Sequence, residues 1–130
     1  MRYYVDTVIA LIGAMLGALL GTLDGVLVAL LICICLDYVT GIIHAIYTKT
    51  LSSEVGFKGL MRKGVILLVV ILANTLDVYV MRAGSTCRTA VCLFYISNEG
   101  ISILENAVAI GLPLPQKLKD ILEDLTNDNT

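Results

Sequence analysis

The chain has 130 residues, of which 58% are apolar and 15% are charged, and its formal net charge is −2. A soluble domain carries about 25% charged residues, so this chain has too few charges to cover the surface of a soluble domain, and it is too hydrophobic to be disordered. A net charge this close to zero gives no signal for nucleic-acid binding. The composition therefore predicts a small all-α integral membrane protein.

Four apolar segments are predicted to cross the membrane as helices. The first two, residues 3–23 and 25–48, are separated only by an Asp-Gly turn signal and are expected to form a tight helical hairpin. The other two are residues 64–81 and 89–111, and prolines follow the last of them. A cleavable signal peptide is an alternative for the first segment, although no Ala-x-Ala cleavage site follows it. Whether that segment spans fully stays open.

Residues 1–112 thus form the predicted transmembrane domain, and residues 113–130 form a cytoplasmic tail. Apolar residues in the tail recur at i, i+3, i+4 and i+7, which predicts a short amphipathic helix over residues 116–125; they are Leu118, Ile121, Leu122 and Leu125. This helix could lie on the membrane surface, pack on another tail or simply be solvated.

The basic residues predict the orientation, because cytoplasmic loops are enriched in Lys and Arg. The predicted loop at residues 49–63 contains Lys49, Lys58, Arg62 and Lys63. Four spans with both termini inside place seven of the nine basic residues in the cytoplasm. If the first segment does not span, the split becomes six to three, and the basic loop is cytoplasmic in both arrangements.

A glycine ladder runs along the first segment, where small residues four apart let helix backbones approach closely in lipid; its members are Gly13, Gly17, Gly21 and Gly25. It could pack the first span on the second within one chain, or it could be a surface for self-association.

Carboxylates within the predicted spans are costly in a bilayer, and no Lys or Arg lies within a span to pair with them. They are therefore expected to be protonated, hydrogen-bonded or facing water. In a closed assembly Glu99 is expected to be protonated or hydrogen-bonded to polar groups such as Asn74 or Asp77. Helical spacing places polar residues on one face of each later span. This predicted polar face contains Asp37, His44, Asn74, Asp77, Asn98, Glu99, Ser102, Glu105 and Asn106. It could be a buried core that fixes helix register, or it could line water in a pore or pathway.

Four cysteines and one histidine give little material for a metal or catalytic site, so no metal, cofactor or enzymatic activity is predicted. Two cysteines sit within the second span, where they are expected to act as small apolar fillers. A disulfide involving Cys87 or Cys92 stays open.

Several strings then resemble a known family. They are LDYVTG at residues 36–41, LSS at 51–53, KGLMRK at 58–63, FYISNEGISILENA at 94–107 and GLPLP at 111–115. Together they are similar to the toxin-secretion/phage-lysis holins, over residues 30–125. The polar run inside the last apolar segment is the most specific part of this resemblance.

The resemblance implies a holin: a non-enzymatic protein that forms homo-oligomers in the bacterial cytoplasmic membrane and opens lesions in it. The lesions would release an endolysin or a large toxin, without direct contact being necessary, and an antiholin is left open as a further partner. The alternative is a small four-helix proton-coupled transporter that uses the intramembrane carboxylates. Against a transporter, the chain has no Trp and few other aromatic residues to line a substrate site.

Overall fold

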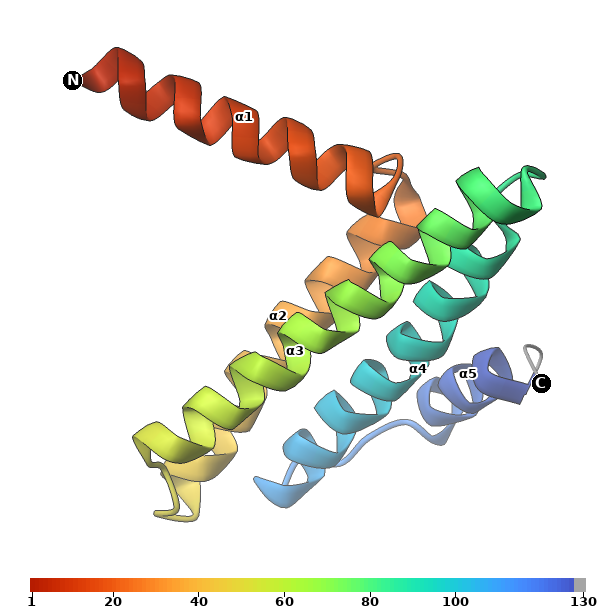
Figure 1. Cartoon of the computed structure of the whole chain (residues 1–130). Helices are drawn as coiled ribbons and strands as arrows, with labels where there is room; N and C mark the ends of the chain where they lie inside the picture. Colours follow the sequence, from red (N-terminus) through yellow and green to blue (C-terminus); the bar gives the residue numbers. More distant parts are fainter. Residues whose placement is uncertain (128–130) are drawn as a thin grey trace.

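The computed structural model describes residues 1–127, with side chains through Leu125, so the last three residues of the predicted tail lie outside the described residues. Every regular element in this part of the chain is helical (Figure 1). The helices are α1 (Arg2–Leu20), α2 (Gly25–Tyr47), α3 (Ser53–Thr75), the π-helix η1 (Leu76–Met81), α4 (Thr86–Ala109) and α5 (Gln116–Asn127).

Helices α2, α3 and α4 lie side by side and form the body of the molecule (Figure 1). Their apolar core is fully buried at Leu30 of α2, Val70 of α3 and Cys92 of α4. Many other apolar residues, mostly on α2 and α3, are exposed. An exposed apolar surface of this extent is suited to contact with lipid. In a bilayer, apolar side chains are not driven into the protein interior, because lipid tails are equally apolar.

Helix α1 leaves the bundle and projects away from α2, so the predicted hairpin of the first two segments is wrong (Figure 1). None of its residues is buried, and only its last turn reaches α3. Gly21 ends the helix with a φ of 89°, a left-handed conformation that glycine adopts without strain and that turns the chain sharply. The rest of α1 is apolar on nearly all sides, so no single face favours packing on α2.

Helix α3 begins at Ser53, so most of the predicted basic loop at residues 49–63 is helix and not loop. The hydroxyl of Ser52 accepts a 3.2 Å hydrogen bond from the backbone N–H of Val55, which caps the helix, and Glu54 lies in the first turn. Lys58, Arg62 and Lys63 therefore project from a helix in fixed directions.

Three helical segments are long and apolar enough to cross a membrane within the described residues: α1, α2 and the continuous segment Ser53–Met81. Helix α4 is the predicted fourth span and does not meet this criterion; its sequence carries Arg88, Glu99 and Glu105. It nevertheless packs along α2 and α3.

The predicted C-terminal helix is present as α5, which doubles back and packs on α4 (Figure 1). The hydroxyl of Ser97 on α4 donates a hydrogen bond to the carbonyl of Leu122 on α5. The tail is therefore part of the folded molecule in this structure.

Candidate functional site

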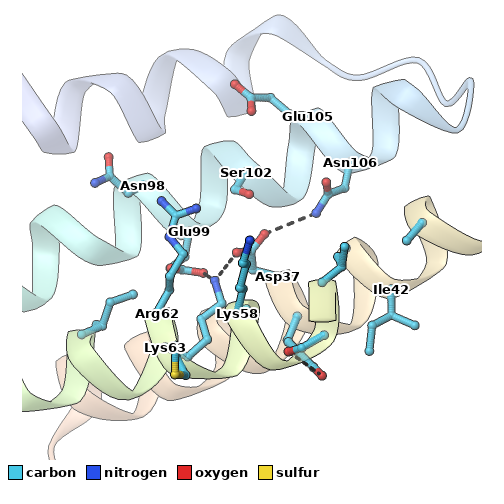
Figure 2. A pocket seen from close by; sticks show the side chains of 18 of the residues that line it. Asp37, Ile42, Lys58, Arg62, Lys63, Asn98, Glu99, Ser102, Glu105 and Asn106 are labelled. Carbon is cyan, nitrogen blue, oxygen red and sulfur yellow. Dashed lines mark hydrogen bonds and ion pairs between the residues drawn. The ribbon is translucent and has the colours of Figure 1, made fainter. Parts of the chain in front are cut away.

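Three charged side chains, one from each helix of the bundle, meet between α2, α3 and α4 (Figure 2). The Lys63 ammonium donates to the carboxylates of both Asp37 and Glu99. The side chains of Lys63, Asp37 and Glu99 are only 16%, 11% and 7% exposed. One cation thus ties together two buried carboxylates, and we call these three residues the ion cluster.

Asn106 extends the ion cluster along α4. Its amide nitrogen lies 3.3 Å from the second carboxylate oxygen of Asp37 and 3.0 Å from the hydroxyl oxygen of Thr40. The Thr40 hydroxyl in turn donates to the Asp37 backbone carbonyl, at 3.1 Å. Asp37 is therefore held from two sides, by an ammonium from α3 and an amide from α4.

The ion cluster carries one positive and two negative charges, so it is formally left with one excess negative charge. Two buried carboxylates this close disfavour each other, and the ammonium between them offsets that repulsion. Removing one member of a buried ion pair strands its partner, which costs far more than the net gain of forming the pair. The cluster thus fixes the register of three helices and is sensitive to the loss of its single cation.

An open cavity of about 1040 Å³ adjoins the ion cluster between the same three helices (Figure 2). Asn98, Ser102 and Glu105 of α4 line it, and so do Lys58 and Arg62 of α3. Asn98 and Glu105 are exposed. This side of α4 therefore presents polar groups to a space that solvent can enter.

Of the nine residues of the predicted polar face, six lie at this site. Asp37, Glu99 and Asn106 bond within it, and Asn98, Ser102 and Glu105 line its cavity. His44 is half-buried but does not line the cavity. Asn74 and Asp77 bond to Leu19, Cys87 and Arg88 at the opposite end of the bundle, so neither of them is the partner of Glu99 within this chain.

Lys63 is the functional residue that sequence reasoning missed, because it was assigned to a basic loop. The expectation that no Lys or Arg could pair with the carboxylates is therefore wrong. The capping pattern at Ser52 was the available signal for a helix. A helix that starts at Ser53 places Lys63 in its third turn, directly before the predicted apolar segment 64–81. A long lysine side chain can then carry its charge several ångströms along the helix.

A second polar cluster closes the other end of the bundle around Arg88, which is 2% exposed. Its guanidinium donates to the Leu20 carbonyl at 2.7 Å, to the Thr22 carbonyl and to the Asp24 carboxylate at 2.9 Å. We call this set of bonds the Arg88 clamp. The hydrogen bond from Arg88 is the main cause that holds the pKa of Asp24 below its usual value.

Asn74 and Asp77 support the Arg88 clamp. The Asn74 amide donates to the Leu19 carbonyl at 2.9 Å, which ties the end of α1 to α3. The Asp77 carboxylate accepts from the backbone N–H groups of Cys87 and Arg88, at 2.9 and 2.8 Å, and so caps α4. Asn74 and Asp77 thus occupy positions within a predicted span because they bond to backbone groups at the ends of α1 and α4 that would otherwise lack a hydrogen-bond partner.

The glycine ladder has no partner within the described chain at three of its four positions. A Cβ added to Gly13, Gly17 or Gly25 would meet nothing within 4 Å. The alternative in which the ladder packs the first span on the second is therefore wrong. A Cβ on Gly21 would lie 2.7 Å from the Asn74 side-chain oxygen and 2.8 Å from the Arg88 Nε, so that position belongs to the turn.

The described residues contain no group of three or more His, Cys, Asp or Glu side chains arranged to hold a metal ion. The four cysteines form no disulfide in this structure, and Cys87 and Cys92 lie on the same helix, α4.

Comparisons with known proteins identify relatives along most of the chain. A sequence profile of the bacteriophage holin family matches residues 14–127. A Clostridium perfringens protein, "Uncharacterized 14.9 kDa protein in nagH 3'region", is 47% identical over 94 residues, which cover 72% of this chain and 71% of the relative. A protein of Bacillus phage phi105 named "Probable holin" is 40% identical over 94 residues, 72% of this chain and 69% of the relative. No solved structure matches the chain.

Proposed function

The chain belongs to the bacteriophage holin family, a family of non-enzymatic membrane proteins, and we propose that it acts as a holin in a bacterial cytoplasmic membrane. In this role several copies assemble and open lesions through which an endolysin or a large toxin leaves the cytoplasm. The observation that carries the proposal is the profile match over residues 14–127, together with the phage relative. An antiholin is a further proposed partner.

The proposed topology has four spans, with α4 as the fourth and both termini in the cytoplasm. The Arg88 clamp supports it, because it joins the turn after α1 to the start of α4 at one end of the bundle. The turn between α2 and α3 and the end of α4 lie at the other end (Figure 1). Lys49, Lys58 and Arg62 lie toward that end. We propose that this end is cytoplasmic, because cytoplasmic loops are enriched in basic residues.

The ion cluster and its cavity suit a protein that changes its assembly. In the monomer Lys63 bridges the carboxylates of Asp37 and Glu99 and offsets their repulsion, while Asn98 and Glu105 stay exposed on the cavity side of α4. Exposed polar groups at membrane depth are tolerated where they face water or other protein, not lipid. We infer that this side of α4 faces its neighbours in a closed assembly and water in an open lesion.

Induced expression tests the proposed function directly. The chain should be expressed in a bacterium together with a cytoplasmic endolysin that has no export signal, with the endolysin alone as the control. We expect abrupt lysis only when both are present, because the endolysin needs a lesion to reach the cell wall. Proton-linked efflux of a small cation without lysis would instead support the transporter alternative.

Gly17 tests the proposed role of α1 in self-association. A Cβ at this position meets nothing within 4 Å and no residue of α1 is buried, so Gly17→Leu should insert and fold normally. It should weaken helix–helix contact by about 1 kcal/mol, or roughly fivefold in cross-linked dimer, because close backbone approach is lost. Chemical cross-linking in membranes at matched protein level gives the measurement, together with lysis time. An unchanged cross-linking pattern and lysis time would mean that the ladder does not mediate assembly.

A further inference from the structure

Helix α5 lies against the middle of α4 and not beyond its end (Figure 1). Ser97 bonds to the Leu122 carbonyl, and a Cβ on Gly100 would lie 2.9 Å from both terminal methyl carbons of Leu122. The missing side chain of Gly100 therefore makes room for Leu122. We call Ser97 and Gly100 the α5 seat.

The depth of the α5 seat follows from helix geometry. Gly100 precedes Ala109, the last residue of α4, by nine residues. At 1.5 Å per residue this is ~14 Å, about half of a hydrocarbon core ~30 Å thick. If α4 spans the membrane, Leu122 in its seat lies near the middle of the bilayer.

Helix α5 is poorly suited to that depth. Glu123 and Asp124 directly follow Leu122 and are exposed while α5 is docked, so lipid would contact them. Five of the twelve residues of α5 are charged, namely Lys117, Lys119, Asp120, Glu123 and Asp124. Charged side chains near the bilayer centre are strongly disfavoured. The same groups are well solvated when water surrounds α4.

We propose that α5 and lipid compete for the same side of α4, so that α5 must leave its seat before lipid can surround that helix. While α5 is docked, it keeps lipid from surrounding α4. After its release, α5 lies at the cytoplasmic surface with its charges in water. This inference rests on the proposed four-span topology and adds a conformational step to it. The step explains why α5 packs on α4, which is the least apolar of the four proposed spans.

Spin-label distances test the competition in the full chain. Labels would be placed at exposed positions on the two helices by Phe94→Cys and Glu123→Cys, after the native cysteines Cys33, Cys35, Cys87 and Cys92 are changed to alanine. The separation should be short in detergent micelles, where α5 stays docked. It should lengthen in phosphatidylcholine–phosphatidylglycerol vesicles, because residue 94 lies ~22 Å along α4 from its end while residue 123 moves to the surface.

The docked fraction should fall at least about tenfold in vesicles, since one charge near the bilayer centre is disfavoured by roughly a hundredfold. Gly100→Leu fills the seat and should give the long separation already in micelles. Gly64→Leu is the matched control, because Gly64 is exposed and a Cβ there meets nothing within 4 Å, and it should keep the short separation in micelles.

A C-terminal reporter that reads the side of the membrane separates this inference from the topology. A cytoplasmic C-terminus with α5 still docked in vesicles would overturn the competition. An external C-terminus with α5 docked would support the competition and refute the four-span topology. Release of α5 with an external C-terminus would also overturn the inference, because lipid around α4 would not be the cause.

Discussion

Replacing Lys63 by methionine should be among the most damaging single changes in the chain. The variant keeps an unbranched side chain only one atom shorter and removes the one cation that bridges Asp37 and Glu99. Two nearly buried carboxylates would then face each other unpaired. Breaking a buried ion pair in this way costs about 3–5 kcal/mol. The free energy of unfolding in detergent micelles, measured by denaturant titration, gives the test.

Lys58→Met provides the matched control for this prediction. Lys58 also lies on α3 and also pairs with a carboxylate, Glu54, but the two side chains are 69% and 76% exposed. An exposed i,i+4 pair contributes only about 0.3–0.5 kcal/mol. Adding Asp37→Asn and Glu99→Gln to Lys63→Met should recover most of the loss, because no charge then remains in the ion cluster. Equal effects of the two lysine changes, or no recovery in the triple variant, would contradict the bridging role.

The sequence predicts the helical elements well, because long apolar runs and the turn residues that separate them are local signals. It also predicts that Asp37, Glu99 and Asn106 belong together in function, because each lies on the polar face of its helix. Helical spacing cannot identify which residue on a third helix reaches that face. The position of Lys63 depends on where α3 begins, and the basic residues around it suggested a loop.

The path of α1 and the seat of α5 were beyond sequence reasoning for a different reason. Helix α1 has no distinct polar side, so its pattern cannot show whether it packs on α2 or contacts lipid. Its direction depends on Arg88, which is 68 residues from Leu20 in sequence. The apolar stripe of α5 predicts that this helix packs on another helix or on the membrane surface. Only the space left by the missing side chain of Gly100, which Leu122 occupies, shows that it packs on α4.

Arg88→Met should release the turn between α1 and α2. The change leaves the carbonyls of Leu20 and Thr22 without their guanidinium donor and Asp24 without its cation. Unsatisfied groups of this kind cost about 1–3 kcal/mol each when buried, and Leu20 and Asp24 are only half-buried, so we expect a loss of about 2–3 kcal/mol in total. Hydrogen exchange at residues 21–24 should accelerate, since these amides lie in the turn that Arg88 holds.

The contribution of Asp24 to the Arg88 clamp has a definite dependence on pH. Arg88 lowers the pKa of Asp24 in the folded protein below its usual value of 3.8. The stabilisation is therefore fully present above the unfolded pKa and is lost as the pH falls through the lower, folded pKa. The difference between wild type and Arg88→Met should accordingly be constant near neutral pH and shrink below pH 3.8. Arg82→Met changes an exposed arginine in the neighbouring turn and should alter neither stability nor exchange. If Arg88→Met behaved like Arg82→Met, the direction of α1 would have to be set by Gly21 and Asn74 alone.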